Sequence, residues 1–179
     1  MAAAGSGSYS GPAQLLIDCF DRIGDAVGEA IKDLSSDQLA ARPDGHANSI
    51  AWLVWHLTRV QDDHIAAAFR VEQLWTAQGW AHRFALPFDL DAIGYGHDHE
   101  DVAALGQAAL SAQLLADYHG AVRAMTIGHL SPLTDADLDR VVDSSYSPPV
   151  TLGVRLVSVV ADDLQHAGQA AFVRGLILS

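Results

Sequence analysis

The sequence predicts an all-α protein, a four-helix bundle with a long connection between its second and third helices. Four long stretches place apolar residues three and four positions apart, which is the spacing of one buried helix face. No stretch alternates apolar and polar residues over several positions, as a half-buried strand would. Half of the 179 residues are hydrophobic, enough for one sizeable core, so a single domain is expected over residues 13–179.

The four helices are bounded by residues that favour caps and turns. Serine and aspartate at 35–37 are expected to end the first helix. The expected helices run from about Ala13 to Leu34, from an N-cap at Asn48 or Ser49 to Phe69 or beyond, from Ser111 to Leu130, and from Thr151 to Leu178. Between the last two, a helical turn over Asp135–Val142 is expected before an extended loop at Ser144–Pro149, because proline disfavours helix.

The connection between the second and third helices is long, from about Trp75 to Asp98, and holds several aromatic residues and histidines. Loops of this length are uncommon inside compact domains and are often lids or binding loops. At its end, Asp98 and Asp101 have the spacing of a helix cap. A short helix is therefore expected to begin there and to continue through Leu105.

Composition restricts the class of partner and the compartment. With a net charge of −12, the chain lacks the basic face that nucleic acids and anionic membranes require. Its apolar runs are shorter than the roughly 18 residues that span a membrane. Residues 1–12 are small and polar, without the features of an export signal, so a flexible tail and a cytoplasmic location are expected. The only cysteine, Cys19, is expected in the core.

Ionisable residues interrupt the apolar stretches of the second and fourth helices. Asp162 and His166 are four residues apart, so they stack on one helix face and can reach one ion. The same spacing suits a hydrogen bond between the two side chains. A third ligand has to come from another helix, and the second helix offers His56 and His64. Periodicity favours His64, but spacing alone does not decide between them.

Two segments resemble the DinB-like superfamily of metal-binding four-helix bundles. In NSIAWLVWHLTRVQDDH, residues 48–64, an aliphatic helix with a His-Leu pair and a polar turn resembles the family's second helix. In DDLQHAGQ, residues 162–169, a ligand followed four residues later by His-x-Gly-Gln resembles its fourth helix. The resemblance extends over nearly the whole chain after residue 13. The stretches FDLDAIGYGHDHEDVAAL and TLGVRLVSVVADDLQHAGQ look like an actinobacterial, mycothiol transferase-like branch.

The resemblance implies that His56, Asp162 and His166 hold a divalent metal ion. Aspartate stands at 162 where family members commonly carry His or Glu, and its shorter side chain is expected to bring the ion nearer the fourth helix or to weaken its binding. Two histidines and one carboxylate leave coordination positions open, which is typical of a catalytic zinc site and also suits iron. Zinc is expected first, with nickel, iron and manganese as alternatives.

Other residues near these positions are candidates for supporting roles. They are Asp163 as an acid or base, Arg59, Trp52 and Tyr95 as substrate contacts, and His64 and Asp63 as partners of the ligands. Each also has a plain structural interpretation, as a packing residue or as one member of an ion pair. Most of the other histidines are expected at the surface; they are His46, His82, His97, His99, His119 and His129.

Three functions are compatible with such a site. In the first, the metal lowers the pKa of a low-molecular-weight thiol, and the thiolate attacks a small electrophile. The composition resembles that of a high-GC actinobacterium, where the thiol would be mycothiol. In the second, a metal-dependent hydrolase activates water with Asp163 as the base. The third is a non-catalytic bundle that binds a metal or small molecule, as a monomer or a homodimer. The thiol transferase acting on a small-molecule substrate is the leading hypothesis.

Overall fold

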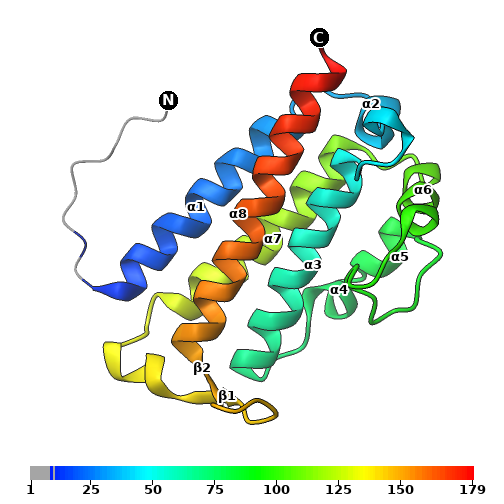
Figure 1. Ribbon diagram of the computed structural model, residues 1–179. Helices are drawn as coiled ribbons and strands as arrows, with labels where there is room; N and C mark the ends of the chain where they lie inside the picture. Colours follow the sequence, from blue (N-terminus) through cyan, green and yellow to red (C-terminus); the bar gives the residue numbers. More distant parts are fainter. Residues whose placement is uncertain (1–8, 10) are drawn as a thin grey trace.

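Four long helices form a bundle in the computed structural model, which describes residue 9 and residues 11–179 (Figure 1). They are α1 (Pro12–Ile31), α3 (Ile50–Phe69), α7 (Ala112–Leu130) and α8 (Leu152–Ile177). Helix α8 packs against both α1 and α3, while α7 packs against the same two helices from the other side. The predicted all-α bundle is confirmed. The tail expected at residues 1–12 lies almost entirely outside the described residues.

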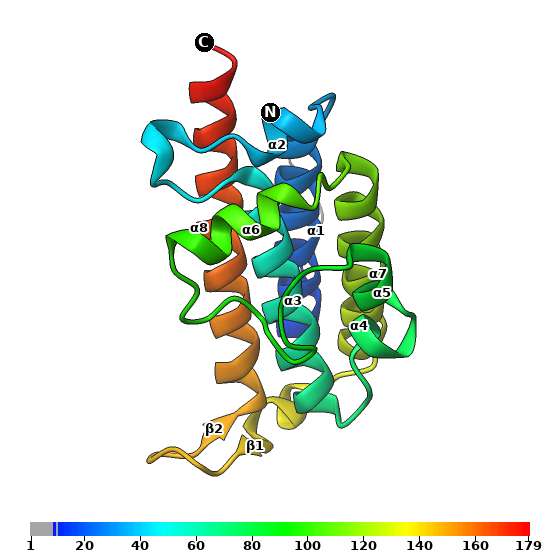
Figure 2. The same ribbon diagram turned by 90° about the vertical axis from the view of Figure 1, so that its right-hand side faces the viewer.

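Short elements occupy the connections. They are α2 (Ser36–Ala40) and η1 (Pro43–Gly45) before α3; α4 (Leu74–Ala77), α5 (Trp80–Phe84) and α6 (His99–Gln107) before α7; and η2 (Asp135–Asp139), β1 (Val141–Asp143) and β2 (Val150–Thr151) before α8. Figure 2 shows α8 along one edge of the bundle and α4 and α5 along the opposite edge, with α6 crossing in front of α3. Among the described helices, none is long and apolar enough to cross a membrane.

Caps explain where several helices begin. Ser49 accepts a hydrogen bond from the Trp52 N–H and starts α3, as one of the two predicted N-caps. The predicted Asp98 and Asp101 capping box starts α6, which continues to Gln107. The first connection differs from the prediction, which expected only a turn there. Ser35 and Gln38 form a capping box that starts the short helix α2.

The connection before α8 also differs from the prediction. The helical turn expected over residues 135–142 ends at Asp139, because residues 141–143 pair with 150–151 as a two-stranded antiparallel sheet. Strands this short carry no alternating pattern that the sequence could reveal. The small sheet stands at the end of α3 and α8 and contacts both helices (Figure 1).

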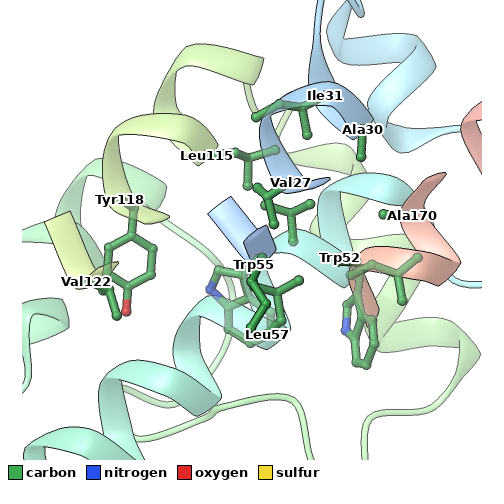
Figure 3. Close-up of a cluster of buried hydrophobic side chains, with 14 of the residues drawn as sticks. Val27, Ala30, Ile31, Trp52, Trp55, Leu57, Leu115, Tyr118, Val122 and Ala170 are labelled. Atoms are coloured by element: carbon green, nitrogen blue, oxygen red, sulfur yellow. The ribbon is translucent and has the colours of Figure 1, made fainter. Parts of the chain in front are cut away.

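All four long helices contribute to the core, but α3 is the most deeply buried. Figure 3 shows Val27 of α1, Leu57 of α3, Val122 of α7 and Ala170 of α8 in one cluster of buried side chains. Residues of α3 are buried on nearly every face, since the bundle covers one side and the long connection covers the other. The polar side chains that α3 carries must therefore find partners inside the protein.

His119 was expected at the surface, but it is buried on α7 against α3. The Thr58 hydroxyl donates its hydrogen to the Val54 carbonyl, so its oxygen is left to accept the His119 Nδ1–H at 3.2 Å. Nε2 is buried and has no hydrogen-bond partner among the described residues. Burial lowers the pKa of the His119 imidazole to about 4, so the ring is neutral at neutral pH.

This burial predicts a pH-dependent loss of stability. An unfolded histidine takes up a proton near pH 6.5, whereas folded His119 resists protonation until about pH 4. As pH falls from 7 to 5, the unfolded state gains a proton that the folded state does not, and the free energy of unfolding falls by about 2 kcal/mol through this residue. Denaturant unfolding at several pH values measures this effect. As pH falls, the free energy of unfolding should decrease more steeply for the wild type than for His119→Gln. Parallel pH profiles for the two proteins would contradict the prediction.

Candidate metal centre

Three potential metal ligands converge between α3 and α8. His56 comes from α3, and Asp162 and His166 come from successive turns of α8. One donor atom of each residue lies within 4.8 Å of the others. Within the described part of the chain, no other group of three His, Cys, Asp or Glu side chains meets this condition. Sequence spacing left His56 and His64 as alternatives, and the structure brings His56 to the other two.

Hydrogen bonds orient both imidazole rings. The Nδ1 of His56 is bonded to the Ile93 carbonyl, which can only accept, so Nδ1 carries the proton. In the same way, the Nδ1 of His166 lies 2.9 Å from the amide oxygen Oε1 of Gln169. Each ring therefore keeps a lone pair on Nε2. This pattern, with one nitrogen donating to an oxygen and the other free, is the usual arrangement of metal-binding histidines.

The Asp162 carboxylate completes a donor set that fits a cation. Its Oδ1 lies 3.7 Å from Nε2 of His166, and its Oδ2 is buried without a hydrogen-bond partner among the described residues. A buried carboxylate oxygen without a donor is costly. Burial also lowers the pKa of the His56 imidazole, which keeps that ring neutral and its lone pair available. The three side chains present therefore fit a divalent metal ion.

Aromatic rings form one wall of the centre. Trp52 stacks on His56, with ring centroids 4.6 Å apart, and its indole N–H donates to Nδ1 of His97 at 3.2 Å. His97 in turn stacks on Trp55. His97 was expected at the surface, and no partner on a nearby turn signals its role, because it reaches the site from the long connection. Trp52, expected as a substrate contact, is buried and supports a ligand ring.

Comparison with known proteins identifies the family. The sequence profile described as the DinB superfamily matches residues 20–170. The chain belongs to the DinB superfamily. A crystal structure of a conserved protein from Enterococcus faecalis is 31% identical in sequence and superposes with a TM-score of 0.84, over 95% of this chain and 99% of that one. A search of curated proteins found no match.

Arg59 fastens the long connection of this DinB-superfamily chain to α3. Its side chain is completely buried, and it donates from Nε to the Ala92 carbonyl and from Nη1 to Gln73 Oε1. It also lies 3.7 Å from the buried carboxylate of Asp62. Asp62 accepts hydrogen bonds from the Tyr118 hydroxyl and from two backbone N–H groups at the start of α4. Arg59 was a candidate substrate contact, but the structure places it in the interior as a support for the connection.

Asp163, the candidate acid or base, does not join the three ligands. Its side chain is fully buried on α8, and both carboxyl oxygens are without hydrogen-bond partners among the described residues. Burial raises the pKa of this carboxyl well above its usual value, and the nearby charge of Asp162 raises it further. The shift favours the protonated form, which is a poor general base.

A polar pocket lies between α3, the start of α8 and the small sheet. Its cavity of about 270 Å³ is lined by Asp63, His64, Ala67, Ala68, Val142, Asp143, Tyr146 and Arg155. His64 Nδ1 lies 3.2 Å from the Asp63 carboxylate, and Arg155 donates to Asp143 at 3.0 Å. His64 lies two turns of α3, about 12 Å, from His56. His64 and Asp63 were expected to support the ligands, but the structure places them in this separate pocket.

Tyr95 lies between the metal centre and the polar pocket. Its ring centroid is 5.4 Å from that of His56 and 6.5 Å from that of His64. The residue is 59% exposed, although it lies beside two buried or half-buried imidazoles. Burial of the rest of the ring and the charge of Asp162 raise the pKa of the Tyr95 phenol, so it keeps its proton at neutral pH.

Gly94 allows the long connection to approach His56 closely. Its φ of +98° is a conformation that glycine adopts without strain. A methyl group at this position would collide with Nδ1 of His56 and touch the ring of Trp55. Gly96, two residues later, also has a positive φ, at +80°, but nothing lies within 4 Å of the place where its methyl group would be.

We therefore expect Gly94→Ala to weaken metal binding by about tenfold or more, because it displaces an imidazole that must be held in place. Gly96→Ala is the matched control, since it introduces a similar backbone strain without the collision. Competition titrations with a zinc-sensitive chelator measure both affinities. Equal affinities in the two variants would mean that the connection shifts without disturbing His56.

Proposed function

We propose that this DinB-superfamily protein is a divalent-metal-dependent transferase that joins a low-molecular-weight thiol to a small electrophile. The observation that supports it most is the open ligand set of two imidazoles and one carboxylate. Three protein ligands leave coordination positions for a substrate, whereas structural zinc sites are closed by four. Zinc is the metal to test first, and mycothiol is the thiol to which the sequence resemblance points.

The metal centre, its aromatic wall and Tyr95 each have a role in this proposal. His56, Asp162 and His166 would hold the ion, and the ion would lower the pKa of a bound thiol so that it reacts as a thiolate. The Trp52 and His97 wall excludes water from one side of the centre. The Tyr95 hydroxyl keeps its proton and can donate a hydrogen bond to a substrate bound beside His56.

The polar pocket suits the polar part of the thiol. It is lined by two carboxylates, one guanidinium, one imidazole and one phenol. This mixture of donors and acceptors has no excess of positive charge, so it favours a hydroxyl-rich or zwitterionic group over a polyanion. A thiol whose polar part extends about 12 Å from its sulfur would occupy both the pocket and the metal centre.

The hydrolase alternative receives less support from the geometry. Its expected base, Asp163, is buried and favours the protonated form. No other carboxylate joins the three ligands in the described part of the chain. Turnover of an ester or amide without added thiol would nevertheless favour hydrolysis over the transferase.

The first test is the metal content of the protein. Wild type incubated with zinc is expected to retain close to one ion per chain, and His56→Ala to lose it, because only two ligands remain. His64→Ala is the matched control, since it removes a histidine from the same helix but outside the three-ligand cluster, and it should retain the ion. Elemental analysis after gel filtration gives the result. Metal lost equally from both variants would contradict the ligand assignment.

The second test is thiol transfer itself. Mass spectrometry should detect a mycothiol conjugate of a chloronitrobenzene-type electrophile with the zinc-loaded wild type and not with His56→Ala. Arg155→Gln should keep its metal but raise the KM for the thiol by about tenfold, the effect of losing one charged contact. A full complement of metal without any conjugate, across several thiols and electrophiles, would argue for a non-catalytic binding bundle.

A further inference from the structure

The outer face of α8 carries a continuous apolar seam. Its positions alternate three and four residues apart, as in a helix that packs against another along its whole length. We call these residues the α8 seam; they are Val154, Val157, Ala161, Leu164, Gly168, Ala171 and Gly175 of α8, and Leu178, the C-cap residue that follows it. Every one of them is exposed, and the four large side chains are each between 46% and 60% exposed. Single exposed apolar residues need no explanation, but a regular row of them marks an interaction surface.

Charge is absent from this face. All residues of α8 are described, and none of the exposed ones is charged, although the chain has a net charge of −12. The exposed faces of α1 and α7, by contrast, carry charged residues, among them Arg22, Asp25 and Asp117. The depletion of charge is typical of the centre of a protein interface. A basic or acidic partner would find nothing to pair with here, so the face fits an uncharged apolar helix.

We propose that the occupant is a second copy of this chain, with the two α8 helices packed antiparallel about a twofold axis midway between Leu164 and Gly168. A twofold axis brings the same surface of both copies together. In an antiparallel pair of helices, the residue numbers of two facing residues therefore always add up to the same total. About this axis, Leu164 lies opposite Gly168 of the second copy, and Val157 lies opposite Gly175. Large side chains thus face glycines, and the seam is complementary in shape to itself.

Two further contacts agree with this axis. Ala161 faces Ala171, and Val154 faces Leu178, so no pair places two large side chains together at the centre and no glycine faces another glycine. Acidic copies can approach because the seam brings no like charges together. The long α8 lies along an outer edge of the bundle (Figure 2), and the seam residues themselves are exposed.

Dimerisation through the seam leaves the metal centre open. Asp162 and His166 point from α8 toward His56 on α3, so they lie on a different face of the helix from the seam. The polar pocket also lies on the α3 side. Each copy in the proposed dimer therefore keeps its own metal centre and polar pocket, and the dimer does not depend on the proposed thiol transfer.

Sedimentation velocity over a range of concentrations tests the dimer. The wild type is expected to show a concentration-dependent monomer–dimer equilibrium. Ala161→Glu is expected to raise the dissociation constant of the dimer at least tenfold. Ala116→Glu is the matched control, because it places the same charge on an exposed alanine of α7 and should leave the equilibrium unchanged. A wild type that stays monomeric at all soluble concentrations would overturn the proposal and leave the seam to a different protein. An equal effect of both substitutions would also overturn it.

Size-swapped variants test the pairing itself. A methyl group at Gly168 meets nothing within 4 Å, so Gly168→Leu should fold normally. It adds apolar surface, yet it should weaken the dimer, because two leucines would then collide across the axis. Adding Leu164→Ala to this variant should restore the dimer by exchanging the large and small positions. If Gly168→Leu associated more strongly than the wild type, the association would be non-specific and hydrophobic. That result would overturn the antiparallel pairing.

Discussion

A helix that is buried on nearly all of its faces must provide a partner for every polar group that it carries, and α3 is such a helix. It buries a histidine, a threonine, an arginine, a glutamine and an aspartate together with its apolar residues. Backbone groups of the long connection satisfy most of these side chains. The Ile93 carbonyl binds His56, the Ala92 carbonyl binds Arg59, and two N–H groups of α4 bind Asp62. The fold of the connection and the position of His56 therefore have the same cause.

The same constraint explains the shape of the candidate metal centre. The hydrogen bond that holds the connection to α3 also fixes the tautomer of His56, and the glycine beside it allows the close approach. On α8, one carboxylate oxygen of Asp162 lies near His166, and the other is buried without a hydrogen-bond partner among the described residues. A buried polar group without a partner is uncommon in folded proteins, and a cation is the simplest group that would satisfy it. The three candidate ligands and the aromatic wall therefore lie together between α3 and α8.

Helix α8 serves three surfaces at once. One face packs into the bundle through residues such as Leu156 and Val159, a second presents Asp162 and His166 to α3, and a third carries the uncharged seam. Membership of the DinB superfamily accounts for the first face and is compatible with the second. A fold supports many activities, so the chemistry has to be argued from the candidate site and its side chains. The proposed thiol transfer is argued from that site, and the proposed dimer from a different face of α8.

The sequence by itself determined the four long helices, a cap at Asn48 or Ser49, the cap at Asp98, and the pair of Asp162 and His166 on one helix face. These features depend on periodicity and on contacts within a few residues, which are local properties of the chain. Only the tertiary structure showed that His119 is buried, that His97 binds Trp52 beside His56, and that Arg59 is an interior residue. It also separated His56 from His64, which the helical pattern of α3 alone could not do. Those outcomes depend on where the long connection crosses α3, and packing between segments far apart in the chain decides that crossing.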